Sequence, residues 1–310
     1  MYFGNLTNCY TKSVIATLVK NPSFTDMVHF EMATSVMSGM VYHRKDVNRL
    51  IDCYCDPDIG IDRALKIFDI PFEICWWRDC DNINEILCVI KKWLKCSQII
   101  IGPINMGALK YIPYHTILTG MDHYIVINCF ENEMYHFFDP QGFANIWLSE
   151  EQLKKLIISS DVIEGRGKFT IRRFYSKIDC IYWSLDIAHN VLKSCSENLF
   201  LAQKMYNGGV NGYLQLADDF EKILNNPSLV RGLTFSLPTR MQRSILLMYL
   251  INDVADFNEK FEIKNLLEKQ VMIFSDLLSL IKSSYKLPSV GMSLLQNIGT
   301  IEAEITKLLS

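Results

Sequence analysis

The sequence has no surplus of positive charge and no apolar segment long enough to cross a bilayer. Its 31 Lys and Arg residues stand against 34 Asp and Glu residues, which gives a net charge of −3 with His neutral. Proteins that hold nucleic-acid phosphates need a surplus of Lys and Arg, so this balance argues against nucleic acid as the main ligand. No apolar run approaches the roughly 20 residues of a membrane span. No basic segment leads into an apolar one at the N-terminus, so we expect a cytoplasmic protein that does not bind membranes.

The ten cysteines lack the spacing of a disulfide framework or of a zinc site. They are scattered along a long chain without a repeated interval, which is unlike small secreted disulfide-rich domains. Cys53 with Cys55 and Cys75 with Cys80 are short pairs, but no second CxxC motif or pair of His residues completes a zinc set. We therefore expect most cysteines to be reduced and buried, with no metal and no bound cofactor.

The pattern of the chain changes once, near residue 185. Hydrophobic residues make up 49% of the chain and charged residues 21%, which is enough apolar material for a packed core. Residues 1–185 mix short helical patterns with apolar runs typical of strands, whereas residues 186–310 show helical spacing almost throughout. This division predicts an α+β catalytic domain followed by a helical cap or bundle domain.

Local signals place the individual elements. Asn8 is a good capping residue for a helix over 9–18, and a hairpin is expected from strands at 122–130 and 134–139, joined by a turn at Glu131–Glu133. Ser149 and Gln152 form a capping box before another helix. The remaining expected helices cover 26–42, 62–68, 83–94, 149–158, 213–224, 238–257, 263–284 and 293–309, and the remaining strands cover 72–77, 97–101 and 169–174.

Cys9 occupies the position in which a cysteine is most easily activated. It is the first residue of the first predicted helix. Helix N-termini stabilise negative charge, so a thiol there ionises more readily, and the thiolate is the nucleophile of cysteine enzymes. Taken alone, a cysteine at a helix start is more often inert.

His123 and Asp139 are expected to meet across the predicted hairpin. His123 lies at the start of the first strand and Asp139 at the end of the returning strand. A carboxylate at that point can accept the imidazole N–H, fix the tautomer and stabilise the imidazolium. Each residue separately has an ordinary structural explanation. Cys9, His123 and Asp139 together, in this order, favour a catalytic triad.

Two other histidines compete for the role of the base. His115 follows a Pro-Tyr loop, and His136 alternates with Phe137 on the second strand of the hairpin. His29 lies in an apolar helical stretch and has the setting of a core histidine. We favour His123 because it alone has a strand partner that carries a carboxylate at the matching end.

The order of a cysteine on the first helix and a His and an Asp on a later hairpin resembles papain-fold cysteine enzymes. Residues 120–127 (GMDHYIVI) and 134–142 (MYHFFDPQG) look like the His strand and the Asp-Pro turn of the peptidases that process bacteriocin leaders. The likeness is closer to the branch typified by the butirosin-biosynthesis acyltransferase. That branch shares the early cysteine, a Gly-Pro-Ile-Asn-like loop within 99–107, the Tyr-Ile-Pro-Tyr segment at 111–114 and a helical C-terminal region. The resemblance is clear over residues 1–180. The remainder is similar only in its general helical character.

Members of that branch move acyl groups from carrier-protein thioesters onto amines. The sequence is also similar to the amide-forming enzyme of closthioamide assembly, which joins a carrier-bound acyl chain to a diamine. The resemblance therefore implies a papain-like domain with an antiparallel sheet and a role in thiotemplated antibiotic biosynthesis. It also implies an acyl or peptidyl carrier protein that delivers the acyl group on phosphopantetheine, and a small amine as acceptor.

One position departs from the papain pattern. Papain-type peptidases place a Gln six residues before the cysteine to help form the oxyanion hole, and here that position is Phe3. An oxyanion donor contributes about 3 kcal/mol, so a substitute is needed. Asn5 is the nearest amide that could serve, helped by the backbone N–H of Cys9. Ordinary loop capping by Asn5 is an equally good explanation.

Two further features have both a functional and a plain interpretation. Tyr111–Tyr114 and the pair Trp76–Trp77 could border an acyl site or simply pack in the core. A basic cluster, consisting of Arg166, Lys168, Arg172 and Arg173, could dock an acidic carrier protein or simply face solvent.

Two rival functions use the same residues. A peptidase or amide hydrolase would differ from a transferase only in water access and in the acceptor site. A non-catalytic papain-fold binding module would keep the fold without the reactivity. The sequence leaves these alternatives open.

Overall fold

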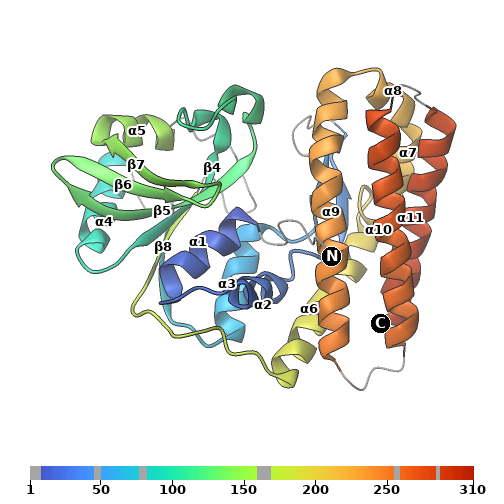
Figure 1. Ribbon diagram of the computed structural model, residues 1–310, viewed down its shortest axis with the longest axis horizontal. Coiled ribbons are helices and arrows are strands. Elements are labelled where there is room, and N and C mark those ends of the chain that lie inside the picture. The colour runs from blue at the N-terminus through green and yellow to red at the C-terminus, as the bar shows by residue number, and fades with distance from the viewer. Residues whose placement is uncertain (1–7, 45–49, 77–81, 159–168, 255–258, 284–286) are drawn as a thin grey trace. The chain divides into compact units, whose positions relative to one another are not determined.

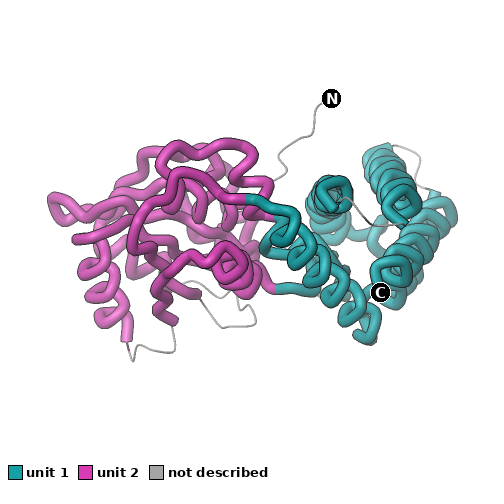
Figure 2. Tube along the Cα trace, turned by 90° about the horizontal axis from the view of Figure 1, so that it is seen from below, with its two compact units in different colours: residues 1–6, 32–55, 183–310 teal, residues 7–31, 56–182 magenta. Residues whose placement is uncertain are grey.

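The computed structural model describes residues 8–44, 50–76, 82–158, 169–254, 259–283 and 287–310. The chain divides into two compact units, coloured in Figure 2. The first, called the sheet unit here, consists of residues 7–31 and 56–182. The second, called the helical unit, consists of residues 1–6, 32–55 and 183–310. Each unit is described by itself.

The sheet unit is built on a six-stranded antiparallel sheet with the order β3-β8-β4-β5-β6-β7. The strands are β3 (Phe72–Trp76), β4 (Ile99–Asn105), β5 (Asp122–Glu131), β6 (Met134–Asp139), β7 (Phe143–Ser149) and β8 (Thr170–Phe174). The prediction of an α+β protein with an antiparallel sheet is therefore confirmed. Strand β7, which pairs with β6, was not expected from the sequence.

The turn between β5 and β6 has the geometry that a tight hairpin requires. Asn132 and Glu133 both have positive φ, at 49° and 61°, and Glu131 pairs with Met134. Two consecutive residues of positive φ match the twist of the flanking strands in a two-residue hairpin loop. The predicted hairpin is confirmed, and it sets the register that brings the far ends of β5 and β6 together.

Helices cover the sheet, as Figure 1 shows. They are α1 (Cys9–Leu18), α2 (Phe24–Thr34), α3 (Pro57–Ile67), α4 (Ile83–Leu94) and α5 (Glu150–Ile158), with short 3₁₀ turns η2 (Met106–Ala108) and η3 (His115–Leu118). Alternate residues of β5 face opposite ways: Ile125 and Ile127 join the core with α4 and α5, whereas Tyr124 packs edge-on against Tyr10 of α1. Helix α1 is thereby held against β5, the strand that carries His123.

The helical unit contains six helices and a two-stranded antiparallel ribbon among its described residues. The helices are α6 (Leu185–Lys204), α7 (Gly209–Asp218), α8 (Phe220–Leu224), α9 (Pro227–Asp253), α10 (Lys260–Lys282) and α11 (Pro288–Leu308), and the ribbon pairs β1 (Met40–Tyr42) with β2 (Ile51–Cys53). Met40, Tyr42 and Ile51 are buried in one core with Phe220 and Phe274. Residues 32–55, which the sequence grouped with the first domain, thus belong to the same unit as residues 183–310.

Several expected helix boundaries were wrong, and the two largest differences concern α2 and α9. The helix expected over 26–42 ends at Thr34, because Ser35 and Gly39 take positive φ and turn the chain into β1. The helix expected to start at Pro238 starts at Pro227, where Asn226 accepts hydrogen bonds from two first-turn N–H groups. A proline at a helix start loses no hydrogen bond, which is why Pro227 begins this helix rather than ending the previous one.

Among the helices that the structure describes, none combines the length and the apolar character needed to pass through a bilayer.

Candidate active site

Cys9 is the first residue of α1, and its side chain is partly exposed. The expected helix start and end are both confirmed. Asn8 stands at the N-cap position in extended conformation, but its side chain makes no capping hydrogen bond. The expected cap is therefore wrong in its detail. The first-turn N–H groups of α1 point toward the N-terminal end, where negative charge is stabilised.

His123 lies on β5 opposite Ile104 of β4 and is 1% exposed. Its Nε2 atom is 2.9 Å from Oδ1 of Asp139, which is the last residue of β6. The hairpin thus brings the two residues together as expected. Nε2 faces the carboxylate, so Nδ1 is the ring nitrogen left for a partner on the other side.

Cys9 is the other residue that acts on this ring. A hydrogen bond between the two side chains and the charge of the Cys9 sulfur both act on the imidazole. Burial is the largest single influence on the pKa of His123 and lowers it, but attraction to Cys9 and to Asp139 and the hydrogen bonds with both residues together outweigh burial and raise the pKa of His123 to about 10. The imidazolium form is therefore favoured at neutral pH, and an imidazolium beside a sulfur stabilises the thiolate.

Asp139 is fully buried and held from three directions. Besides the His123 ring, the backbone N–H of Gln141 donates to Oδ1 at 2.7 Å and the hydroxyl of Tyr111 donates to Oδ2 at 2.8 Å. Burial favours the neutral acid, but these hydrogen bonds, led by the one from His123, lower the pKa of Asp139 below its ordinary value. The carboxylate is charged at neutral pH and orients the imidazole.

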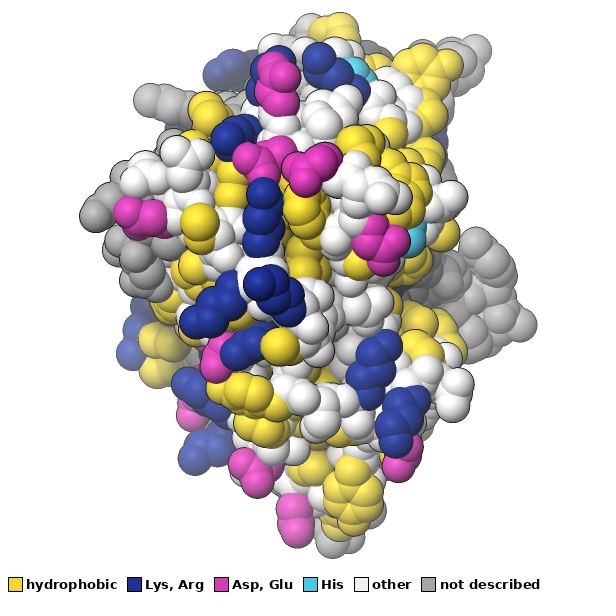
Figure 3. Space-filling model, turned by 90° about the vertical axis from the view of Figure 1, so that its left-hand side faces the viewer, with side chains coloured by type: hydrophobic (Ala, Val, Ile, Leu, Met, Phe, Trp, Pro, Cys, Tyr) yellow, Lys and Arg dark blue, Asp and Glu magenta, His cyan; other side chains and the backbone are white. Residues whose placement is uncertain are grey.

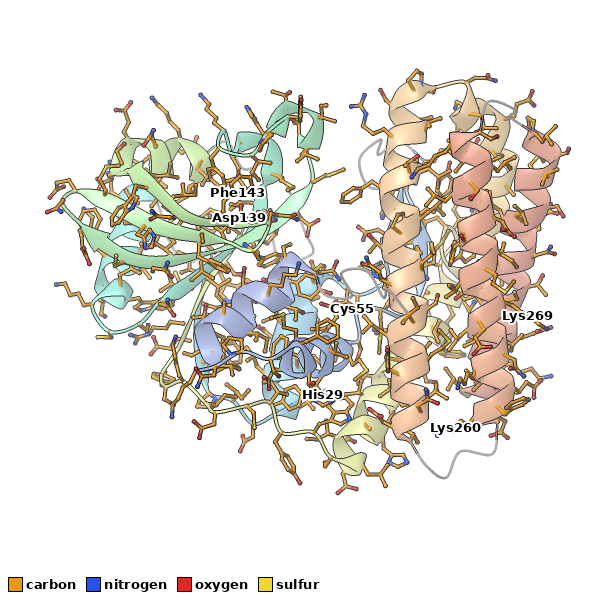
Figure 4. The ribbon with its side chains drawn as sticks, viewed as in Figure 1. His29, Cys55, Asp139, Phe143, Lys260 and Lys269 are labelled. Atoms are coloured by element: carbon orange, nitrogen blue, oxygen red, sulfur yellow. The ribbon has the colours of Figure 1, made fainter. Side chains whose placement is uncertain are left out.

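Tyr111 has a role that sequence reasoning missed. The segment at 111–114 was expected either to border an acyl site or to pack in the core, and the structure shows that the Tyr111 hydroxyl is bonded to Asp139. Its ring meets Phe143 edge to face, with centroids 5.5 Å apart. Figure 4 shows Phe143 and Asp139 next to each other on the sheet. No local pattern in the sequence marks a tyrosine 28 positions before its carboxylate, so only the folded chain identifies this contact.

A cleft of about 960 Å³ opens beside Tyr111 in the sheet unit. Tyr111 forms part of its wall together with Asn105, Lys110, Trp147 and Lys155, whereas neither Cys9 nor His123 lines it among the described residues. The cleft has the size of a small-molecule site. It adjoins Tyr111, whose hydroxyl is bonded to Asp139.

The competing histidines are engaged elsewhere. Nδ1 of His115 is 2.6 Å from the carbonyl oxygen of Gly107, and the ring of His136 stacks on Trp147 with centroids 4.6 Å apart. Neither ring has a hydrogen bond or ion pair with a carboxylate in the part of the chain that the structure describes. His29 lies on α2 and is only partly buried. Of the three histidines considered for the base, His123 is the one that the structure places against a carboxylate.

The expected oxyanion donor and some neighbours fall outside the described residues. Asn5 and Phe3 both lie there, as does Trp77, so the role expected for Asn5 stays a prediction. Trp76 is partly buried on β3, and Tyr114 is largely exposed. Of the expected oxyanion donors, the backbone N–H of Cys9 is the one that the structure places at the helix start.

The expected basic docking cluster is wrong for the two members that the structure describes. Arg172 is buried, and its guanidinium pairs with Asp58 and Asp62. Arg173 pairs with Glu73 on the neighbouring strand. Arg166 and Lys168 lie outside the described residues. On the face shown in Figure 3, Lys and Arg side chains lie near acidic and apolar ones, so this face is not a purely basic surface.

Replacing Arg172 with leucine is expected to lower the free energy of unfolding by about 3–5 kcal/mol, because two buried carboxylates lose their guanidinium partner. Urea unfolding followed by circular dichroism measures this. Arg173→Leu is the matched control on the same strand, since its pair with Glu73 is only partly buried and its loss should cost less than the loss of the fully buried network. Equal losses in the two variants would contradict the buried network.

The raised pKa of His123 predicts how the stability of the fold and the protonation of the imidazole depend on pH. The folded-state pKa of about 10 exceeds the ordinary value of 6.5. This proton therefore stabilises the fold fully below pH 6.5, and the contribution is lost as pH rises through about 10. An NMR titration of the imidazole should show it protonated at pH 7. In Cys9→Ala the pKa should fall, because the sulfur contributes most to raising it. An imidazole that is neutral at pH 7 in the wild type would contradict this.

Among the residues that the structure describes, no group of three or more His, Cys, Asp or Glu side chains is placed to hold a metal ion.

No protein-family model matches the chain. It is similar to the uncharacterized protein YobF of Bacillus subtilis (strain 168), with 29% identity over 177 residues. The match covers 57% of this chain and 55% of YobF, so the chain spans about half the length of that relative.

Proposed function

We propose that the protein is a cysteine-dependent acyltransferase whose sheet unit has a papain-like fold. In this proposal Cys9 accepts an acyl group from a carrier-protein thioester and passes it to a small amine. The observation that carries the proposal is the buried imidazole of His123, held by Asp139 on one side and hydrogen-bonded to the Cys9 sulfur on the other. The order of the three residues along the chain and on the elements supports the papain-like assignment.

The first half-reaction begins with the thiolate and the imidazolium. The Cys9 sulfur attacks the thioester carbonyl, and the carbon–sulfur bond to the carrier thiol breaks. His123 gives its proton to the departing thiolate, so the carrier leaves as a thiol and Cys9 holds the acyl group as a new thioester. Exchange of one thioester for another is nearly neutral in free energy.

The second half-reaction uses His123 in the opposite sense. The neutral imidazole accepts a proton from the incoming amine as its nitrogen attacks the acyl carbon. The Cys9–acyl bond breaks, an amide leaves, and the thiolate–imidazolium pair is restored. Asp139 stabilises the imidazolium and keeps the ring in one orientation throughout. Because forming an amide from a thioester is downhill, the cycle needs no ATP.

The oxyanion of each tetrahedral intermediate forms next to the start of α1. Hydrogen-bond donors aimed at this point stabilise the transition state. In the proposal the backbone N–H of Cys9 supplies one donor and the Asn5 amide supplies the second.

Intact-protein mass spectrometry tests the proposal. Mixing the protein with a carrier-bound acyl thioester should add the mass of one acyl group, and adding a diamine should discharge it as an amide. Release of free acid at the same rate with and without amine would identify a hydrolase instead. Absence of any adduct across a panel of acyl carriers, together with an unreactive Cys9, would leave a binding module.

A further inference from the structure

The two residues on either side of Cys9 are fastened to one buried carboxylate. Glu31 on α2 is 1% exposed. Its Oε2 accepts the backbone N–H of Asn8 at 3.0 Å, and its Oε1 accepts the Asn8 side-chain amide at 2.8 Å. The Tyr10 hydroxyl also donates to Oε1. Because Asn8 and Tyr10 flank Cys9, Glu31 holds the backbone on one side of Cys9 and a side chain on the other.

These contacts also explain why α1 lacks its expected cap. Asparagine at an N-cap normally accepts a hydrogen bond from a first-turn N–H through its side-chain oxygen. Here the Asn8 amide is turned toward Glu31 and Tyr10, and it makes no capping bond. The Asn8 side chain therefore does not compete with a thiolate or an oxyanion for the N-terminal end of α1.

Lys12 is a positively charged residue near Glu31 and Cys9, at the start of α1. It is half-buried one helical turn after Cys9. Burial lowers the pKa of Lys12, while attraction to Cys9 and to Glu31 opposes that fall. The carboxylate of Glu31, the ammonium of Lys12 and the sulfur of Cys9 therefore interact at the start of α1. The His123 imidazolium interacts with the same sulfur.

We propose that Glu31 is a positioning residue that sets the Cys9 sulfur against the His123 imidazole by clamping Asn8 and Tyr10. In this proposal it touches no substrate, and it acts on Cys9 through these two neighbours. The inference rests on the proposed role of Cys9 as the nucleophile. Without the clamp, Asn8 is free to turn back and cap α1, and the sulfur loses its fixed distance to the imidazolium.

The test is Glu31→Gln, which keeps the size of the side chain. A glutamine has one acceptor oxygen and one NH₂ group, so it cannot accept at both positions that Glu31 serves. We expect the rate of Cys9 alkylation by iodoacetamide at pH 7 to fall about tenfold, with the pH profile moving up by about one unit. Peptide mass spectrometry separates Cys9 from the exposed Cys88 and Cys96, which serve as internal standards.

The sign of the effect distinguishes positioning from simple charge. Removing a negative charge near a thiol, with no change of geometry, favours the thiolate and would speed alkylation. A rate that is unchanged or faster in Glu31→Gln overturns the proposal. Should Glu31→Gln fail to fold, Tyr10→Phe removes a single hydrogen bond of the clamp and should slow Cys9 alkylation by about threefold. An unchanged rate there overturns the proposal equally.

Asp26→Asn is the matched control, because it alters another buried carboxylate on the same helix. Asp26 accepts the backbone N–H groups of Ser23 at 2.9 Å and of Ile181 at 2.7 Å, which are other parts of the chain than Asn8 and Tyr10. It should change thermal stability and leave the pH profile of Cys9 unchanged. A parallel shift in both variants would show a merely structural role. If wild-type Cys9 reacts no faster than Cys88, the proposed function itself fails, whatever Glu31→Gln does.

Discussion

Cys9→Ala is expected to abolish both the acyl-enzyme adduct and amide formation, with a loss in rate of about 10⁵-fold or more. The sulfur is the atom that bonds to the acyl group in the proposed mechanism, and no other group replaces it at the start of α1. Intact mass spectrometry with a carrier-bound thioester measures the adduct, and chromatography of the product measures the amide.

The control for this variant is Cys88→Ala, on the exposed side of α4. Cys88 is freely accessible but is not part of the His123–Asp139 arrangement, so its removal should leave the adduct and the rate unchanged. An adduct that survives in Cys9→Ala and disappears in another cysteine variant would assign the nucleophile elsewhere. The proposed transferase mechanism would then be wrong.

His123→Ala is expected to slow amide formation by about 10⁴-fold, because the same imidazole protonates the departing thiol and deprotonates the amine. It should also slow alkylation of Cys9 near pH 6, where the wild-type sulfur keeps its imidazolium partner. Folding must be checked by circular dichroism, since His123 is fully buried.

His136→Ala is the matched control for that variant. His136 lies on β6, next to the strand that carries His123, and its ring stacks on Trp147. Its loss should leave both the rate of amide formation and the pH profile of Cys9 alkylation within about twofold of wild type, which is the range of a surface change. A severe loss in His136→Ala combined with an active His123→Ala would show that the wrong histidine has been assigned.

Some parts of the site were accessible from the sequence because their signals are local. The start of α1 at Cys9 follows from a polar residue before a helical pattern. The hairpin follows from alternating apolar residues around a short turn, and its register carries His123 to Asp139. The capping box at Ser149 is confirmed by hydrogen bonds in both directions with Gln152.

Other parts depended on contacts between distant segments. Arg172 had the sequence pattern of a surface charge, but its side chain is buried and paired with two carboxylates on α3. Residues 32–55 had no local feature that separates them from the first domain, yet they pack with α7 and α9. Pro238 had the pattern of a helix start, but the helix begins at Asn226–Pro227 and continues through it.

The amino-acid sequence was enough to place Cys9 at a helix start and to bring His123 to Asp139, because helix starts, turns and strand alternation act over a few neighbouring residues. It could not predict that Tyr111 would hold Asp139, or that Glu31 would turn Asn8 away from the helix it was expected to cap. Those contacts join residues 28 and 23 positions apart. A buried polar group takes whichever partner packing brings within reach, and packing is a property of the whole folded chain.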